Sequence, residues 1–199
     1  MKKISPVVCI IVLAGLLAGC ATSYKPIVLE SLTYQRYKSD DDFTIEVVDN
    51  VLLATNNVRY QKYAQNSSLS IYSVKIANHT NEPITFTYDN FQAYSGTERI
   101  RLARLEDSVK PLKQPSAIYL LWGLLWMSFC NGDSCVPIPI GLLIGVINMG
   151  TASSANSHVQ SELSSRALIG QTVQPGQEVI GVVGLHSSSS LSLDFRIVK

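Results

Sequence analysis

The sequence predicts a mainly β fold, an antiparallel β-sandwich that is interrupted by an apolar helical hairpin and a short helix. Of the 199 residues, 46% are hydrophobic, but they are distributed unevenly. Residues 1–20 and 117–149 together hold 36 apolar residues in 53 positions, whereas the remaining 146 positions hold 56. Outside these two segments, short runs alternate between apolar and polar residues, with turn formers between them. Such alternation is typical of strands that bury one face.

The charge balance argues against a nucleic-acid partner. Lysine and arginine total 16 and aspartate and glutamate total 15, so the formal net charge is +1. Proteins that bind nucleic acid usually concentrate an excess of basic residues. The composition also excludes a disordered chain, because disordered segments contain fewer apolar residues.

The N-terminus has the pattern of a targeting segment. Met1–Lys3 is basic, and the apolar run Val7–Leu17 is too short for a permanent membrane helix, which needs roughly 20 residues. A secretory signal peptide that is cleaved near Ala18 is one interpretation. However, the following Leu17-Ala18-Gly19-Cys20 resembles the lipobox of bacterial lipoproteins.

This resemblance implies that residues 1–19 are removed and that Cys20 becomes the acylated N-terminus, with palmitate or similar chains on it. Ala21 follows the cysteine, where an aspartate would signal retention in the inner membrane. The resemblance therefore implies the periplasmic face of the outer membrane, with the inner membrane as the less expected site. Residues 20–42 are mostly polar and are interpreted as a tether or leading strand, before a domain that spans residues 43–199.

The first half of this domain contains several predicted strands. Phe43–Val47 alternates and Val51–Ala54 continues it after a short break. Tyr72–Ala77 and Ile84–Tyr88 are expected to form a hairpin-like pair, because the six residues between them are dense in turn formers. Phe91–Tyr94 and 100–105 are weaker strands on either side of a Ser-Gly-Thr turn.

The same pattern returns at the C-terminal end. A Gln-Pro-Gly-Gln turn at 174–177 precedes an apolar strand at 179–185, and 191–197 alternates most clearly of all. About seven short strands of this kind favour an immunoglobulin-like sandwich. The pattern is similar to that of small bacterial envelope modules, among them uncharacterised lipoproteins. It lacks the core cysteine pair and strand tryptophan of antibody domains, and other antiparallel barrels stay open.

A helical insertion is predicted at residues 114–169. Between Lys113 and Glu162 the only charged residue is Asp133. Two apolar arms, 117–129 and 136–149, flank a turn at 130–135, which predicts a helical hairpin over 117–149. Each arm would be about 20 Å long as a helix, short of the ~30 Å hydrocarbon core, and Pro137 and Pro139 disrupt the second arm. A polar linker at 151–156 and a short helix at 158–168 follow, which Gly170 closes.

The hairpin has three possible partners: the sandwich, which it would cover, one membrane leaflet, or another protein, including a second copy of the chain. Trp122 and Trp126, four residues apart, would share a helical face, and tryptophan favours membrane interfaces as well as cores and protein contacts. Gly141 and Gly145 form a GxxxG pattern that permits close helix approach. The predicted membrane or partner contacts are Trp122, Leu125, Trp126, Leu142 and Ile144.

Cys130 and Cys135 are the cysteines that remain when Cys9 is removed and Cys20 is acylated. In an oxidising periplasm they are expected to form a disulfide that fixes the hairpin tip. Four residues separate them, whereas redox motifs have two, and the three histidines are too scattered to complete a metal site. We therefore expect no metal and no cofactor.

The sequence contains none of the common catalytic or nucleotide-binding motifs. The prediction is therefore a non-enzymatic, membrane-anchored module for binding or assembly that uses its apolar hairpin for contact. One alternative is a carrier or sensor that holds an apolar ligand between hairpin and sandwich. Another is a structural component of the envelope that assembles into oligomers.

The lipobox assignment makes one direct prediction. Changing Cys20 to Ala removes the thiol that acylation requires, so we expect labelling with a fatty-acid analogue to disappear and an uncleaved precursor to accumulate. Gel mobility and metabolic labelling of the two proteins measure both effects. Unchanged labelling of the Cys20→Ala chain would refute the assignment.

Overall fold

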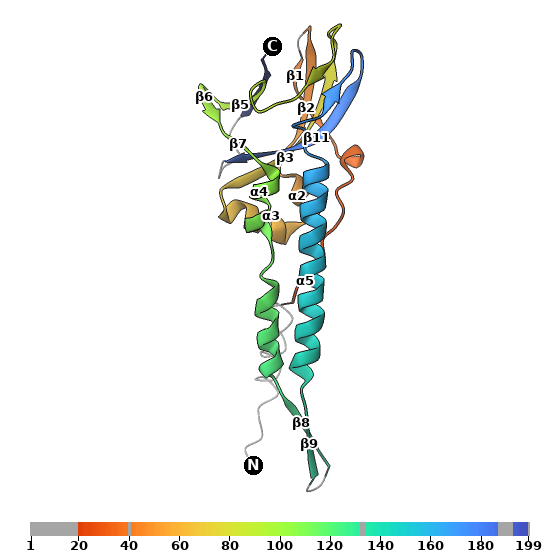
Figure 1. The fold of residues 1–199 in the computed structure, drawn as a ribbon, viewed down its shortest axis with the longest axis vertical. Coiled ribbons are helices and arrows are strands. Elements are labelled where there is room, and N and C mark those ends of the chain that lie inside the picture. The colour runs from red at the N-terminus through yellow and green to blue at the C-terminus, as the bar shows by residue number, and fades with distance from the viewer. Residues whose placement is uncertain (1–19, 40, 132–133, 187–192, 199) are drawn as a thin grey trace. The chain divides into compact units, whose positions relative to one another are not determined.

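The computed structural model describes residues 20–39, 41–131, 134–186 and 193–198. The chain divides into two compact units. Unit 1 holds 114–155 together with the N-terminal residues up to Ser23, and unit 2 holds Tyr24–Lys113 and Asn156–Lys199. The predicted signal peptide, residues 1–19, lies outside the described residues. Figure 1 shows the helices and strands, coloured from red at the N-terminus to blue at the C-terminus.

A five-stranded antiparallel sheet is the largest element of unit 2, with strand order β1-β2-β3-β11-β7. Its strands are β1 (Gln35–Ser39), β2 (Phe43–Val48), β3 (Leu69–Asn78), β7 (Leu102–Ala103) and β11 (Glu178–His186). β3 and β11 pair over nine residues, from Ala77 opposite Glu178 to Leu69 opposite His186. This long ladder joins segments that are about a hundred residues apart in the sequence.

Two smaller antiparallel sheets complete the strands of unit 2. The three-stranded sheet has the order β12-β5-β6, with β5 at Phe91–Ser95, β6 at Glu98–Ile100 and β12 at Leu193–Ile197. The two-stranded sheet pairs β4 (Ile84–Thr85) with β10 (Thr172–Val173). At the β5–β6 turn, Gly96 has a φ of 61°, a left-handed conformation that glycine adopts without a steric penalty.

Short helices connect these strands. They are the 3₁₀ helices η1 (Leu29–Ser31) and η2 (Lys110–Leu112) and the α-helices α2 (Val51–Ala54), α3 (Val58–Asn66) and α4 (Leu105–Ser108). Val51 and Leu52 on α2 and Tyr60 and Ala64 on α3 are buried. These helices therefore contribute to a core, and are not surface connections.

The core of unit 2 is built from all three of its sheets, with Val173 of β10 among its buried residues. Ile45, Val74 and Val183 come from the five-stranded sheet, and Phe91 and Phe195 come from the three-stranded sheet, where their rings stack 5.6 Å apart. Aromatic pairs at such distances stabilise a core beyond the area that they bury. The alternating burial along β2 arises because successive side chains point to opposite faces of a strand.

Gly181 on β11 allows the backbone of Leu168 to pack closely against the sheet. A Cβ atom at this position would lie 2.6 Å from the Cα of Leu168 and 3.0 Å from its backbone nitrogen. The Leu168 amide also donates a hydrogen bond to the carbonyl of Val182, and the Val182 amide donates to the carbonyl of Arg166. The backbone after the long helix α5 (Ile140–Ser165) thus lies directly against the sheet.

The prediction of antiparallel sheets is confirmed, but the fold is mixed and not mainly β, with 35% helix and 33% strand. Val51–Ala54, predicted as a strand, is helical. Four apolar residues are too few to separate the two periodicities, and both Val51 and Leu52 are buried as one helical face. The predicted pairing of Tyr72–Ala77 with Ile84–Tyr88 is also wrong, because β3 pairs with β2 and β11, and β4 pairs with β10.

Unit 1 does not contain the predicted helical hairpin. The first arm forms the 3₁₀ helix η3 (Ser116–Leu124), and the predicted tip forms a β-hairpin of β8 (Met127–Asn131) and β9 (Ser134–Ile138). Pro137 and Pro139 exclude a helix there, and proline is tolerated at a strand without sheet neighbours on both sides. α5 then continues without interruption through the predicted linker 151–156, and its residues up to Ala155 belong to unit 1.

The predicted tether, residues 20–42, is folded where the structure describes it. It contains η1 and β1, and Ile27 and Leu29 within it are buried. The Ile27 amide donates a 2.9 Å hydrogen bond to Glu162, and Lys25 exchanges two hydrogen bonds with the side chain of Asn57. Residues 35–39 of this segment therefore form a strand, and the residues around Ile27 pack against the rest of unit 2.

Tyr24 is held in unit 2 in a form that resists ionisation. Its ring lies edge-on to Tyr60, with centroids 5.6 Å apart. Burial, followed by the nearby negative charge of Glu162, raises the pKa of Tyr24 well above the ordinary value for tyrosine. The hydroxyl lies near that carboxylate without a well-formed hydrogen bond. Replacement of Tyr24 by phenylalanine therefore removes the ionisable group without removing a stabilising contact.

We expect Tyr24→Phe to reduce the loss of stability in alkali. The raised pKa means that the folded state keeps a proton that the unfolded state releases, so this contribution to stability is complete below about pH 10 and is lost as the pH rises above it. The loss is up to about 1.4 kcal/mol per pH unit for one such proton. Urea unfolding of both proteins at neutral pH and above pH 10 measures it, and equal losses in the two proteins would contradict the prediction.

Candidate functional site

The helix face that α5 turns inward in unit 1 consists of small and polar residues. Gly141, Gly145, Asn148 and Ala152 follow one another at spacings of four, three and four residues, and all are buried. A Cβ atom at Gly145 would lie 2.6 Å from the carbonyl oxygen of Tyr119 on η3. A Cβ atom at Gly141 would collide with the carbonyl oxygen of Trp122 and would lie 2.7 Å from the Cβ of Leu125. The GxxxG pattern therefore does permit close approach of two segments, here α5 and η3.

The large apolar side chains of unit 1 point outward instead. Twelve of the seventeen large hydrophobic residues that are exposed in the described part of the chain belong to this unit. Leu124, Leu143 and Trp126 are exposed to 75%, 64% and 63%. The others are Ile118, Leu120, Leu121, Leu125, Val136, Ile138, Leu142, Val146 and Ile147. These twelve residues are called the apolar surface below.

The predicted contact residues fall partly on this surface. Leu125, Trp126 and Leu142 are exposed, whereas Trp122 and Ile144 are half-buried. The two tryptophans do not share a helical face, since η3 ends at Leu124 and Trp126 lies in the connection to β8. Trp122 instead lies beside α5, because a Cβ at Gly145 would be 3.5 Å from its Cβ.

The backbone that follows Cys20 is hydrogen-bonded to this unit by two side-chain amides. The Ala21 amide donates to Oδ1 of Asn148 at 2.6 Å. Thr22 and Gln114 are joined twice, since the Thr22 amide donates to Oε1 at 3.1 Å and Nε2 donates to the Thr22 carbonyl at 2.7 Å. Both amide side chains are buried. The predicted acylation site is thus positioned at the same unit as the apolar surface.

Gln114 and Asn148 were not identified from the sequence. A signal was available, since Asn148 is the only amide side chain in the second apolar arm and Gln114 begins the uncharged segment. Buried amides require hydrogen-bond partners, so an isolated amide in an apolar run indicates a specific contact. The sequence could not indicate that the partner was the backbone at residues 21–22.

Cys130 and Cys135 stand directly opposite each other in the β8–β9 hairpin. In antiparallel pairs, opposed Cα atoms are about 4.5 or 5.5 Å apart, and both values lie within the range that a disulfide requires. The register is therefore compatible with the predicted bridge, which stays a prediction. The predicted turn residues 132 and 133 lie outside the described residues.

The chemistry available on this surface is that of apolar contact. The described residues contain no group of three or more histidine, cysteine, aspartate and glutamate side chains that could hold a metal ion. No helix in the described ranges is long and apolar enough to span a membrane. A surface of leucine, isoleucine, valine and tryptophan side chains without charges is stabilised when water is removed from it.

Comparisons with known proteins give no relative for this chain. No protein-family model matches it, and neither a curated protein nor a solved structure is significantly similar to it.

The packing of α5 against η3 leads to a prediction with a control in the same helix. An alanine at Gly145 forces its Cβ against the Tyr119 carbonyl, so we expect Gly145→Ala to destabilise unit 1 by about 1–3 kcal/mol. Hydrogen exchange of the amides of η3 should accelerate about tenfold or more. At Gly150 an added Cβ meets nothing, and Gly150→Ala should slow exchange or leave it unchanged. Equal exchange rates in the two variants would contradict this packing.

Proposed function

We propose that the chain is an envelope lipoprotein that is anchored by acyl chains on Cys20 and that inserts the apolar surface of unit 1 into the same membrane leaflet. The membrane is the outer membrane, at its periplasmic face. Unit 2, in which the five-stranded and three-stranded sheets would form an immunoglobulin-like sandwich, is a binding or assembly module and not an enzyme.

The observation that carries the proposal is the inverted burial of unit 1. On α5, Gly141, Gly145 and Asn148 are buried, while Leu142, Leu143, Val146 and Ile147 are exposed. In water the large apolar side chains would be expected inside. In a membrane the reverse is typical, since small and polar residues mediate contacts between segments and large apolar residues face lipid.

The dimensions of α5 and η3, the helical part of the apolar surface, favour one leaflet. The apolar start of α5, from Ile140 to Ile147, extends about 12 Å at about 1.5 Å per residue. The nine residues of η3 extend about 18 Å at about 2 Å per residue. Half of a typical hydrocarbon core is about 15 Å thick. Both elements therefore match the depth of a single leaflet.

The position of the anchor supports the same arrangement. Asn148, which binds the Ala21 amide, is on α5 one residue after the last exposed apolar side chain of this helix, Ile147. Acyl chains on Cys20 would therefore begin beside the apolar start of α5. Between Lys113 and Glu162 only Asp133 is charged, so insertion requires few charged groups to leave water.

Tryptophan fluorescence tests the proposal selectively, because both tryptophans of the chain are in unit 1. We expect the acylated protein in vesicles to be quenched by phospholipids with bromine on their acyl chains and protected from acrylamide in water. Triple replacement of Leu121, Leu124 and Leu143 by serine should reduce the bromine quenching strongly. Each exposed leucine contributes about 1.5–3 kcal/mol when it is buried.

A matched control is available in unit 2. Leu53 and Val58 are exposed to 52% and 59%, and their replacement by serine should leave the quenching unchanged. Protection from acrylamide without bromine quenching would show that the apolar surface is buried against protein, as in an oligomer, and would overturn insertion. Free access of acrylamide would overturn both arrangements.

A further inference from the structure

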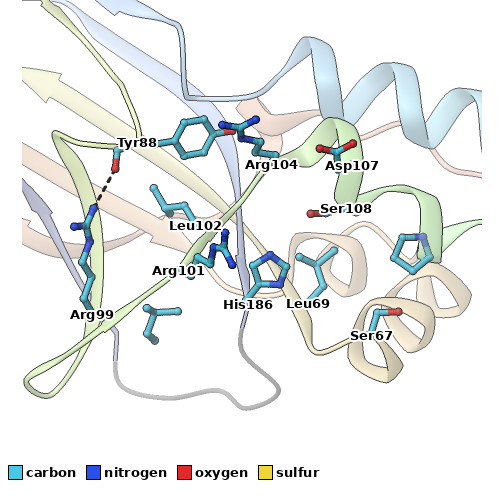
Figure 2. A pocket seen from close by; sticks show the side chains of 12 residues that line it. Ser67, Leu69, Tyr88, Arg99, Arg101, Leu102, Arg104, Asp107, Ser108 and His186 are labelled. Atoms are coloured by element: carbon cyan, nitrogen blue, oxygen red, sulfur yellow. Dashed lines mark hydrogen bonds between the residues drawn. The ribbon is translucent and has the colours of Figure 1, made fainter.

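Unit 2 contains a cavity of about 720 Å³ that is lined by an unusual number of arginines. Arg99 and Arg101 come from β6 and the residue after it, Arg104 precedes α4, and His186 ends β11 (Figure 2). Every residue that lines it belongs to unit 2. The cavity therefore shares no residue with the apolar surface.

The lining carries more positive than negative charge. Among the described residues, Arg99, Arg101 and Arg104 form no salt bridge, and the only acidic residue of the lining is Asp107. Asp107 pairs instead with Lys110 at 3.5 Å. The lining thus carries a formal charge of +2, three arginines less one aspartate, whereas the whole chain carries +1.

Contacts to the backbone and to a ring hold these arginines in place. Nη2 of Arg99 donates a 3.1 Å hydrogen bond to the carbonyl of Tyr88, and the guanidinium of Arg104 lies 5.7 Å from the centre of the Tyr88 ring. The His186 amide donates to the carbonyl of Arg101 at 3.0 Å. Figure 2 shows the Arg101 and His186 side chains close together. The side chains of Arg99 and Arg104 are thus positioned by Tyr88, whereas the hydrogen bond from His186 fixes only the backbone of Arg101.

Apolar residues complete the cavity. Leu69 is buried and Leu102 is half-buried beneath the arginines. Arg99, Arg101, Arg104 and His186 are themselves exposed, so the cavity is open and an anionic ligand can reach these side chains directly from solvent. The volume lies within the range of about 300–1,000 Å³ that is common for small-molecule sites and exceeds that of a single small anion.

We propose that this cavity binds the phosphate group of a small organic phosphate. Guanidinium groups present N–H donors in a planar fork that matches phosphate oxygens, and such charge-assisted hydrogen bonds are among the strongest in proteins. Three arginines from separate positions suit a tetrahedral anion with three free oxygens better than a planar carboxylate with two. The remaining volume over Leu69 and Leu102 accommodates the organic part of the ligand.

Calorimetric titration of the full acylated protein in a non-ionic detergent tests this, with glycerol 3-phosphate and inorganic phosphate as probes and acetate for comparison. We expect saturable binding of both phosphates, with acetate weaker. Arg101→Gln and Arg104→Gln should each weaken phosphate binding about tenfold or more, because each removes charged donors. Binding should also weaken as salt rises.

Arg59→Gln is the matched control, since it removes the same charge from unit 2 outside the lining. It should leave the affinity within about twofold. Absence of saturable phosphate binding, or equal weakening by Arg59→Gln, would overturn the proposal. The titration needs no membrane, so its failure is distinct from a failure of membrane insertion.

Nanodiscs distinguish the two sources of a phosphate group. If a lipid headgroup is the natural ligand, phosphatidylglycerol in the disc should compete and lower the apparent affinity for glycerol 3-phosphate relative to discs of phosphatidylcholine alone. Equal affinity in the two discs would indicate a soluble phosphate ester. Either result supports phosphate recognition, provided that Arg101→Gln weakens binding.

Discussion

The pairing of β3 with β11 is the interaction on which the rest of the fold depends. Its nine-residue register joins Leu69–Asn78 to Glu178–His186, so the ladder holds together the two ends of the long segment between these strands. Closing such a loop is entropically unfavourable, although the penalty grows only slowly with length. A long ladder with a shared aromatic core can offset that penalty. The chain can therefore carry the residues of unit 1 between these two strands. The same ladder ends at Leu69 opposite His186, where the arginine-lined cavity lies.

Strong local alternation was sufficient to predict several strands of unit 2. β2 and β5 follow the expected positions, because each buries alternate residues in the core. β11 also lies where it was expected, but it was predicted from a continuous apolar run, and its residues 181–185 are buried on both faces. The partners of these strands could not be predicted, since alternation specifies which face is buried and not which strand lies beside it. The prediction of a strand at Val51–Ala54 was wrong for a different reason. A run of four apolar residues fits one turn of a helix as well as a short strand.

Unit 1 shows the limits of apolar content as a signal. The uncharged segment was correctly recognised as exceptional, but apolar content alone does not distinguish arms that cover a core from arms that face outward. Ala152, Ala155 and Asn156 look like a linker by composition, yet all are buried on α5. Small residues at helical spacing allow a neighbouring backbone to approach closely, because they have no large side chain. The spacing of Arg99 and Arg101 could have indicated the cavity. They are two residues apart in a short strand region, so both side chains lie on the same face.

The amide contacts at residues 21 and 22 have a kinetic consequence for the proposed anchor. Because Asn148 and Gln114 fix the backbone next to Cys20, acyl chains on this residue and the apolar surface of unit 1 would belong to one rigid body. Two attachments on one body bind as a bivalent unit, since either one keeps the other at a high effective concentration near the bilayer. The protein then leaves the bilayer only when the acyl chains and the apolar surface are detached at the same time. Because this is much rarer than the release of either one, dissociation is slow. If a flexible linker followed Cys20 instead, the apolar surface could detach and associate with neighbouring proteins while the acyl chains stayed in the membrane.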